Sequence, residues 1–246
     1  MGAIMADLSE IRVTMGQTVA LGLILAVAAL MPTVVSADDG EDAVEEMSAQ
    51  ELTERVQHYY GETEDFQAAF LQTYTDIAAG ETTRSRGRVY FKKPGMMRWD
   101  YYQPDAEQRD RLLVSDGSVF WVYEFDYQQV FRQCLEDSQL PTALSFLMGE
   151  GELEEEFEVS LADESEDGKP TLELVPREPT SHYQRIHFTV DPEAFQVSKT
   201  TVFDPYGNRN EVEFLNVRVN QNLSEEGFQF EVPEGARELN PEEECD

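Results

Sequence analysis

Apolar and polar side chains alternate over four short segments between residues 86 and 123. An alternation with a period of two places one set of side chains on one face of a β-sheet. The alternating apolar positions are, in order, Val89 and Phe91; Met97, Trp99 and Tyr101; Leu112 and Val114; and Phe120 and Val122. The segments are separated by residues of turn-forming type at 93–95, 103–105 and 115–117. The pattern predicts an antiparallel meander with an aromatic face.

Further strands are predicted on both sides of this meander. They cover residues 66–74, 128–132, 157–161, 171–175, 183–190, 195–202, 211–217 and 228–232. Glycine, proline and asparagine separate most of these segments. Successive strands with few helices argue for an antiparallel sheet rather than a parallel α/β fold, so the predicted class is mainly β (α+β).

Two segments have the signals of helices. Ser48 and Glu51 form a capping-box pattern, and a helical apolar stripe follows it to about residue 60. The second segment, residues 141–148, begins with proline and ends before Gly149. Its apolar stripe consists of Leu144, Leu147 and Met148.

The two ends of the chain differ from the middle. Residues 1–37 resemble a secretory signal, because the apolar run at 18–31 is short for a membrane span and a small-x-small cleavage pattern ends at Ala37. Residues 38–47 form an acidic linker, and residues 236–246 form an acidic tail. One domain is therefore expected over residues 48–235.

The chain has 246 residues and a formal net charge of −32. Nucleic acid is excluded as a partner on this ground, because the sequence offers no basic patch to meet phosphates. The acidic excess and the few lysines are what we expect of a protein that works in high salt, and simple solubility is the competing interpretation. We therefore expect the melting temperature to rise from low to molar salt, as screening relieves self-repulsion. A melting temperature that does not change with salt would contradict this expectation.

Candidate chemistry in the sequence is sparse. The chain contains no GxSxG motif, and its three histidines are His58, His182 and His187. The last two differ by an odd number of residues on a predicted strand, so they point to opposite faces and do not share a metal. We therefore expect no catalytic site, no metal and no cofactor. Cys134 and Cys245 either form a bridge or remain two thiols, and the sequence leaves both possibilities open.

Residues 86–123 also match the sequence pattern of a known family, over a long stretch and in the same order along the chain. This stretch reads RGRVYFKKPGMMRWDYYQP and then LLVSDGSVFWVY, preceded by Phe66, Ala68 and Phe70. This pattern resembles the LolA family of periplasmic carriers of outer-membrane lipoproteins. Weaker similarity continues at residues 141–144, 174–176, 204–208 and 228–233. The resemblance implies an incomplete antiparallel β-barrel of about eleven strands, closed on its open side by helices.

The resemblance also implies a function and partners. A monomeric carrier in the periplasm would receive acylated lipoproteins from an inner-membrane ABC-type lipoprotein release complex. It would deliver them to an outer-membrane, LolB-like acceptor. Alternatives are an RseB-like sensor of lipids or lipoproteins, a carrier of another amphiphile such as a glycolipid, and a lipid hydrolase.

Two sets of site residues follow from the resemblance. An acyl-chain cavity is assigned to Phe70, Val89, Phe91, Met97, Trp99, Val114, Trp121, Leu144, Leu147 and Met148. The sequence alone does not fix which strand face points inward, and ordinary core packing is the competing interpretation. A latch that holds the first helix is assigned to Lys93, where many family members carry arginine, and to Arg98. For Lys93 a solvated lysine at a turn is the competing interpretation.

Overall fold

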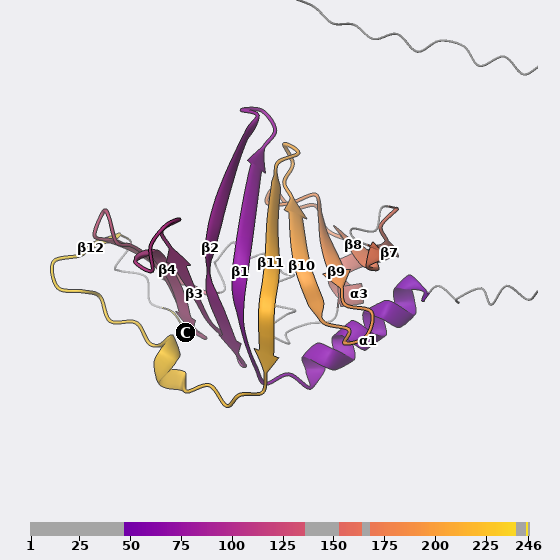
Figure 1. Ribbon diagram of the computed structural model, residues 1–246, viewed down its shortest axis with the longest axis horizontal. Coiled ribbons are helices and arrows are strands. Elements are labelled where there is room, and N and C mark those ends of the chain that lie inside the picture. The colour runs from indigo at the N-terminus through magenta and orange to yellow at the C-terminus, as the bar shows by residue number, and fades with distance from the viewer. Residues whose placement is uncertain (1–46, 136–152, 164–167, 240–244, 246) are drawn as a thin grey trace, which may run out of the picture. The chain divides into compact units, whose positions relative to one another are not determined.

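The computed structural model describes residues 47–135, 153–163, 168–239 and 245. The strands of these residues form one sheet in the order β12-β6-β5-β4-β3-β2-β1-β11-β10-β9-β8-β7. The sheet is curled (Figure 1). It is open, because β12 and β7 lie at its two edges and do not pair with each other. The strands are β1 Asp65–Asp76, β2 Glu81–Lys92, β3 Met96–Tyr102, β4 Arg109–Asp116, β5 Val119–Glu124, β6 Gln129–Cys134, β7 Phe157–Leu161, β8 Thr171–Pro176, β9 Arg185–Val190, β10 Val197–Phe203, β11 Arg209–Val219 and β12 Arg237–Leu239.

The structure confirms the predicted class of fold. Every predicted strand is present except the one at residues 228–232. Neighbouring strands pair in antiparallel fashion, apart from β12, which runs parallel to β6. Of the two helices expected to close the open side, only the first lies in the described residues. The second, at residues 141–148, lies outside them.

One prediction for the C-terminal region is wrong, and one strand there was not predicted. The 3₁₀ helix η2, Glu225–Phe228, stands where a strand was expected to begin, with the Ser224 side chain accepting a hydrogen bond from the Glu226 amide. Phe230 packs against the sheet instead of pairing in it. The expected acidic tail supplies β12, which the sequence did not indicate because an edge strand of three residues is too short to show a periodicity.

Helix α1, Ala49–Gly61, begins as the sequence predicts. The Ser48 side chain accepts a hydrogen bond from the Glu51 amide at 3.2 Å, which caps the helix. Leu52, Val56 and Tyr60 are buried and form the apolar stripe, and the helix contacts β7 and β8. A second short helix, α3 (Leu153–Glu156), leads directly into β7. None of the helices in the described ranges has the length and apolar character needed to cross a bilayer.

The two faces of the sheet carry separate apolar clusters. The larger cluster includes the buried stripe of α1 together with Phe70 and Trp99, and we call its side of the sheet the core face. The smaller cluster contains Val114 and Val130, with Phe230 packed against it, and we call that side the outer face. The C-terminal segment after β11 therefore covers part of the outer face, while α1 covers part of the core face.

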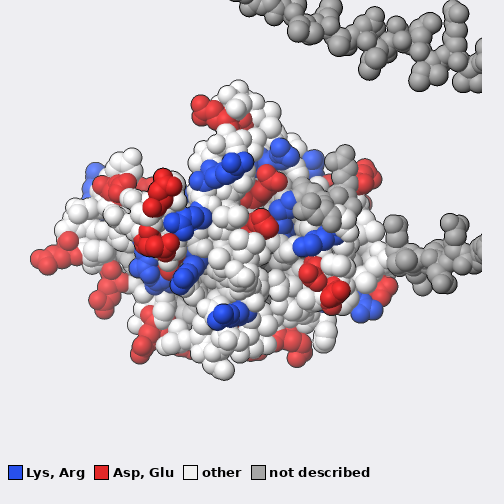
Figure 2. Space-filling view, in the orientation of Figure 1, with Lys and Arg blue, Asp and Glu red and all other residues white. Residues whose placement is uncertain are grey.

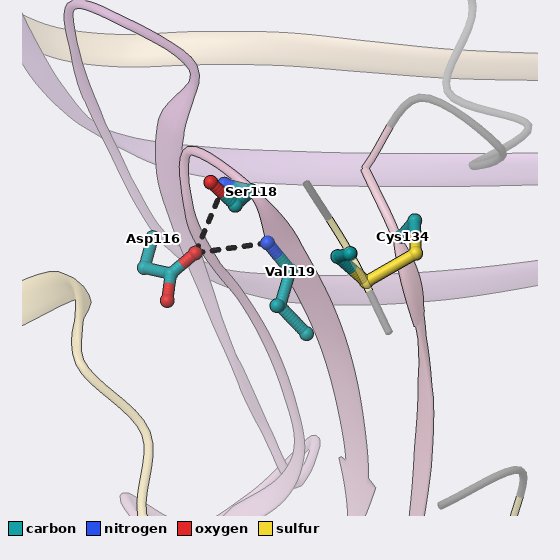
Figure 3. The surroundings of a disulfide bond; sticks show 5 residues. Asp116, Ser118, Val119 and Cys134 are labelled. Carbon is teal, nitrogen blue, oxygen red and sulfur yellow. Dashed lines mark hydrogen bonds between the residues drawn. A yellow bond between two sulfur atoms is a disulfide. The ribbon is translucent and has the colours of Figure 1, made fainter. Parts of the chain in front are cut away.

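A disulfide joins Cys134 at the end of β6 to Cys245, with the two Cα atoms 5.3 Å apart. The sequence left this pairing open. Beside the bridge, the Asp116 carboxylate accepts hydrogen bonds from the amides of Ser118 at 3.0 Å and Val119 at 2.9 Å (Figure 3). These bonds fix the turn between β4 and β5, next to the strand that carries Cys134.

Candidate functional site

The core face presents a cluster of interlocking aromatic rings. The Phe70 ring meets Trp99 and Tyr101 edge-on, with both centroid separations at 4.9 Å. Phe214 extends the cluster onto β11, with its centroid 6.4 Å from that of Trp99. Each such pair contributes about 0.5–1.5 kcal/mol beyond the burial of its area. The members of the cluster are Phe66, Phe70, Phe91, Trp99, Tyr101 and Phe214.

The structure brings five of the predicted cavity residues together and separates two others from them. The first group belongs to the core-face cluster and consists of Phe70, Val89, Phe91, Met97 and Trp99. Val114 and Trp121 belong to the outer-face cluster. The prediction that Val114 and Trp121 line the same cavity as the other five is therefore wrong, because they lie on the other face of the sheet. The remaining three, Leu144, Leu147 and Met148, lie outside the described residues.

Strand register explains why the two residues lie on the other face. Residues directly opposite each other in an antiparallel pair share a face. Trp99 faces Leu113, which in turn faces Val122. Leu113 and Val122 therefore extend the core face across β4 and β5, and both pack against its cluster. Neither residue was predicted as a site residue, although the alternation in β5 already placed Val122 on the opposite face to Trp121.

The end of α1 is tied to the sheet through Tyr60. This side chain is 2% exposed, and its hydroxyl accepts a hydrogen bond from the Val197 amide at 3.2 Å. Burial raises the pKa of Tyr60 well above its ordinary value, so the hydroxyl stays neutral. One residue earlier, the Tyr59 hydroxyl donates to the Gln196 side chain at 3.2 Å. The last turn of the helix is thus positioned against the start of β10.

Lys93, in the turn between β2 and β3, also attaches the end of α1 to the sheet. Its Nζ donates to the backbone carbonyl of Tyr60 at 2.8 Å and to that of Gly61 at 3.0 Å. These are C-terminal carbonyls of α1, which lie at the negative end of the helix dipole and attract a positive charge. Lys93 therefore contacts the end of α1, and its role as a latch stays a prediction.

Arg98 is not part of this attachment. It projects from the outer face, where its Nη1 donates to the Gly227 carbonyl at 3.0 Å and its guanidinium pairs with Asp100 at 3.2 Å. Its assignment to the latch therefore places it on the wrong side of the sheet. Lys92 also holds the C-terminal segment, through a hydrogen bond from its Nζ to the Leu223 carbonyl at 2.8 Å.

The two neighbouring lysines make a matched pair for an experiment. We expect Lys93→Ala to speed amide hydrogen exchange in α1 by roughly tenfold or more, because a hydrogen bond from a charged donor contributes about 1.5–3 kcal/mol. Lys92→Ala should instead speed exchange in residues 221–228. Hydrogen exchange followed by mass spectrometry measures both. Equal exchange in α1 for the wild type and Lys93→Ala would show that the lysine does not hold the helix.

A hollow of about 520 Å³ opens beside α1. Its lining includes Tyr59 and Thr63 from the helix end, Phe195 from the turn before β10, and Val219 from the end of β11. Tyr59, Phe195 and Val219 also pack against the core-face cluster. The hollow therefore leads from the surface to the rim of the apolar core. The Arg55 guanidinium lies 4.9 Å from the centre of the Phe195 ring.

Across the ranges that the structure describes, no group of three or more histidine, cysteine or acidic side chains is arranged to hold a metal ion. His187 bonds to Glu173 at 2.9 Å on the outer face. The described residues therefore offer an apolar surface and a tethered helix as the candidate site.

An open antiparallel sheet with one apolar face partly covered by an N-terminal helix defines a half-barrel protein. The chain belongs to the LolA family: the family's sequence model, described as "Outer membrane lipoprotein carrier protein LolA", matches residues 61–231.

Curated relatives agree with this assignment. An outer-membrane lipoprotein carrier protein of Methylococcus capsulatus is 28% identical over 74% of this chain and 84% of its own length. One of Legionella pneumophila is 31% identical over 63% of this chain and 73% of its own length. A LolA superfamily protein of Nitrosomonas europaea aligns in structure over 74% of this chain and 98% of its own, at 14% identity and a TM-score of 0.42.

Proposed function

We propose that this chain is a periplasmic carrier that shields the acyl chains of lipoproteins on their way to the outer membrane. The observation that carries the proposal is the aromatic core face beside a helix whose end accepts a hydrogen bond from Lys93, in a member of the LolA family. The relatives are themselves named outer-membrane lipoprotein carrier proteins. Residues 1–37 would serve as the export signal.

The need for shielding is thermodynamic. Each methylene that leaves a bilayer for water costs on the order of 0.8 kcal/mol, so an acylated protein cannot cross an aqueous space unaided. A carrier must therefore offer apolar surface, and it needs no covalent chemistry. Donor and acceptor would be an ABC-type lipoprotein release complex and a LolB-like protein, as the resemblance implies.

Access to the apolar surface would depend on α1. Trp99 is 5% exposed and Phe70 is 1% exposed, so acyl chains reach these rings only if the elements above them move. Lys93 holds the end of α1, and the hollow beside Tyr59 and Phe195 reaches the rim of the core. We propose that acyl chains enter at this hollow as α1 swings away. Lysine lacks the planar fork of arginine, so its hold is easier to release.

The two tryptophans of the chain offer a direct test, because they lie on opposite faces of the sheet. Trp121→Phe leaves Trp99 as the reporter on the core face, and Trp99→Phe leaves Trp121 on the outer face. Addition of a brominated fatty acyl probe should strongly quench the fluorescence of Trp99 and leave that of Trp121 nearly unchanged.

Other results would count against the proposal. Equal quenching of both tryptophans would indicate nonspecific binding, and no quenching of Trp99 would mean that the core face takes up no acyl chain. A competing proposal, a carrier of glycolipids, predicts the same quenching. The two are separated by identifying the cargo that copurifies with the protein.

A further inference from the structure

A polar cavity of about 290 Å³ lies on the outer face, away from the acyl-chain site proposed above. The residues that line this cavity are brought together by the pairing of β1 with β2 and β11. Gln67 of β1 pairs with Tyr90 of β2 on one side and with Arg218 of β11 on the other. The next outer-face position of β1 is Ala69, which pairs with Arg88. The short alanine side chain leaves a depression between two arginines.

A bulge adds to this depression. The pairing of β1 with β11 shifts between Gln67 and Ala69, and Asn216 opposite this point has a φ of 53°. Bulges of this kind bend a strand and redirect its side chains. Asn216 and Arg218 both line the cavity, and both are exposed. The lining described here contains two arginines and no acidic side chain.

The lining of this cavity is positively charged, whereas the chain as a whole is strongly negative. The formal net charge is −32, yet arginines recur along the outer face of β2 at positions 84, 86 and 88. Figure 2 shows lysine and arginine side chains spread over the middle of the sheet face, with acidic side chains among them. No basic patch was predicted from the sequence, because Arg88 and Arg218 are far apart in the chain and meet only across β1.

A second cavity of about 290 Å³ adjoins the first, because Tyr90 lines both. Arg98 and Arg109 line it, and both pair with the Asp100 carboxylate, at 3.2 Å and 3.0 Å. Two guanidinium groups against one carboxylate leave an excess positive charge. Leu223 and Phe228 supply an apolar wall.

The two adjoining cavities, with Arg88 and Arg218 at one end and Arg98 and Arg109 at the other, are called the basic track. We propose that the basic track binds an extended, acidic peptide segment of a partner protein. Carboxylates of the segment would pair with Arg88 and Arg218, since guanidinium groups bind carboxylates with two parallel hydrogen bonds. An apolar side chain of the same segment would pass Tyr90 and enter the cavity beside Phe228. The proposal does not depend on acyl-chain binding, because it concerns the opposite face of the sheet.

A narrow peptide fits the charge distribution better than a membrane or a nucleic acid does. Charges are screened beyond about 8 Å at physiological ionic strength. A single acidic strand lying in the track would therefore interact mainly with the arginines. An anionic bilayer or a long polyanion would also meet the acidic surroundings, whose charge dominates the molecule.

The test uses the full mature chain and a fluorescein-labelled decapeptide of glutamates with one central phenylalanine. Fluorescence anisotropy at low ionic strength should show binding that weakens as salt is raised. The double variant Arg88→Glu/Arg218→Glu should bind at least tenfold more weakly. A peptide with glutamine in place of glutamate should bind at least tenfold more weakly to the wild type.

A control variant separates local from overall charge. Arg177→Glu/Arg237→Glu changes the net charge by the same amount at two other exposed arginines and should leave peptide affinity within twofold of the wild type. Equal loss in both double variants would overturn the proposal, and so would equal binding of the glutamine peptide. Vesicles of phosphatidylglycerol that bind through Arg88 and Arg218 while the acidic peptide does not would also overturn it.

Discussion

Gly87→Val should lower the free energy of unfolding by about 3 kcal/mol or more, because the side chain would be forced into a filled space. Gly87 lies in β2 opposite Phe70 on one side and Tyr101 on the other. A Cβ atom at this position would collide with the backbone oxygen of Asp100 and with the Phe70 ring. Because one of these obstacles is backbone, the sheet itself would have to shift. Urea unfolding of the two proteins measures the loss.

A second glycine supplies the control. A Cβ atom at Gly227 would meet nothing within 4 Å, so Gly227→Ala should change stability by less than about 0.5 kcal/mol. A Gly87→Val protein as stable as the wild type would show that the Phe70 ring does not lie over Gly87. The aromatic cluster described here would then be incorrect at its centre.

Removal of the disulfide is expected to have an effect of similar size. The bridge between Cys134 and Cys245 closes a loop with a sequence separation of 111. In the chain-entropy description, opening a loop of this length destabilises a protein by about 4 to 5 kcal/mol at most. We expect Cys134→Ala/Cys245→Ala to lower the unfolding midpoint accordingly. β12 should also lose protection from hydrogen exchange, since the bridge follows it in the chain.

The reductant dithiothreitol provides the comparison. It should shift the wild type to the unfolding midpoint of the double variant and leave the variant unchanged. An unfolding midpoint that is the same with and without reductant, and the same in the variant, would mean that the two cysteines are not joined in the folded protein.

The strands could be predicted because their signal is local. Alternation in β3 places Met97, Trp99 and Tyr101 on one face, and the structure keeps these three in one cluster. The C-terminal segment has a similar alternation around Phe228 and Phe230, yet it forms no strand there. Its phenylalanines pack on a sheet face that already exists, and packing of this kind depends on residues that the local pattern does not contain.

The phase of β4 shows a different limit. Leu112, Leu113 and Val114 are all apolar, so a period of two does not choose between the faces of this strand. Only the pairing of Leu113 with Trp99 decides which of them joins the core face. Register across strands is a long-range property, which is why Val114 was misplaced.

The placement of the charged residues also depends on pairing between strands that are distant in the sequence. Lys93 lies inside the motif that carries the family resemblance, and its hydrogen bonds reach the end of α1, where the resemblance implied a contact. Arg98 lies in the same motif but projects to the opposite face, and the basic track depends on residues from β2 and β11. The motif identified Lys93 and Arg98 in the sequence, but Arg88 and Arg218 come together only through the pairing of β2, β1 and β11.

Native mass spectrometry tests the central claim most directly. The protein should be isolated from the cells that make it and analysed intact, and whatever is bound should then be extracted and identified. We predict a mass consistent with a bound acylated lipoprotein. A bare protein that also fails to take up a fluorescent acyl probe would contradict the account, because the core face would then be filled core rather than a binding surface.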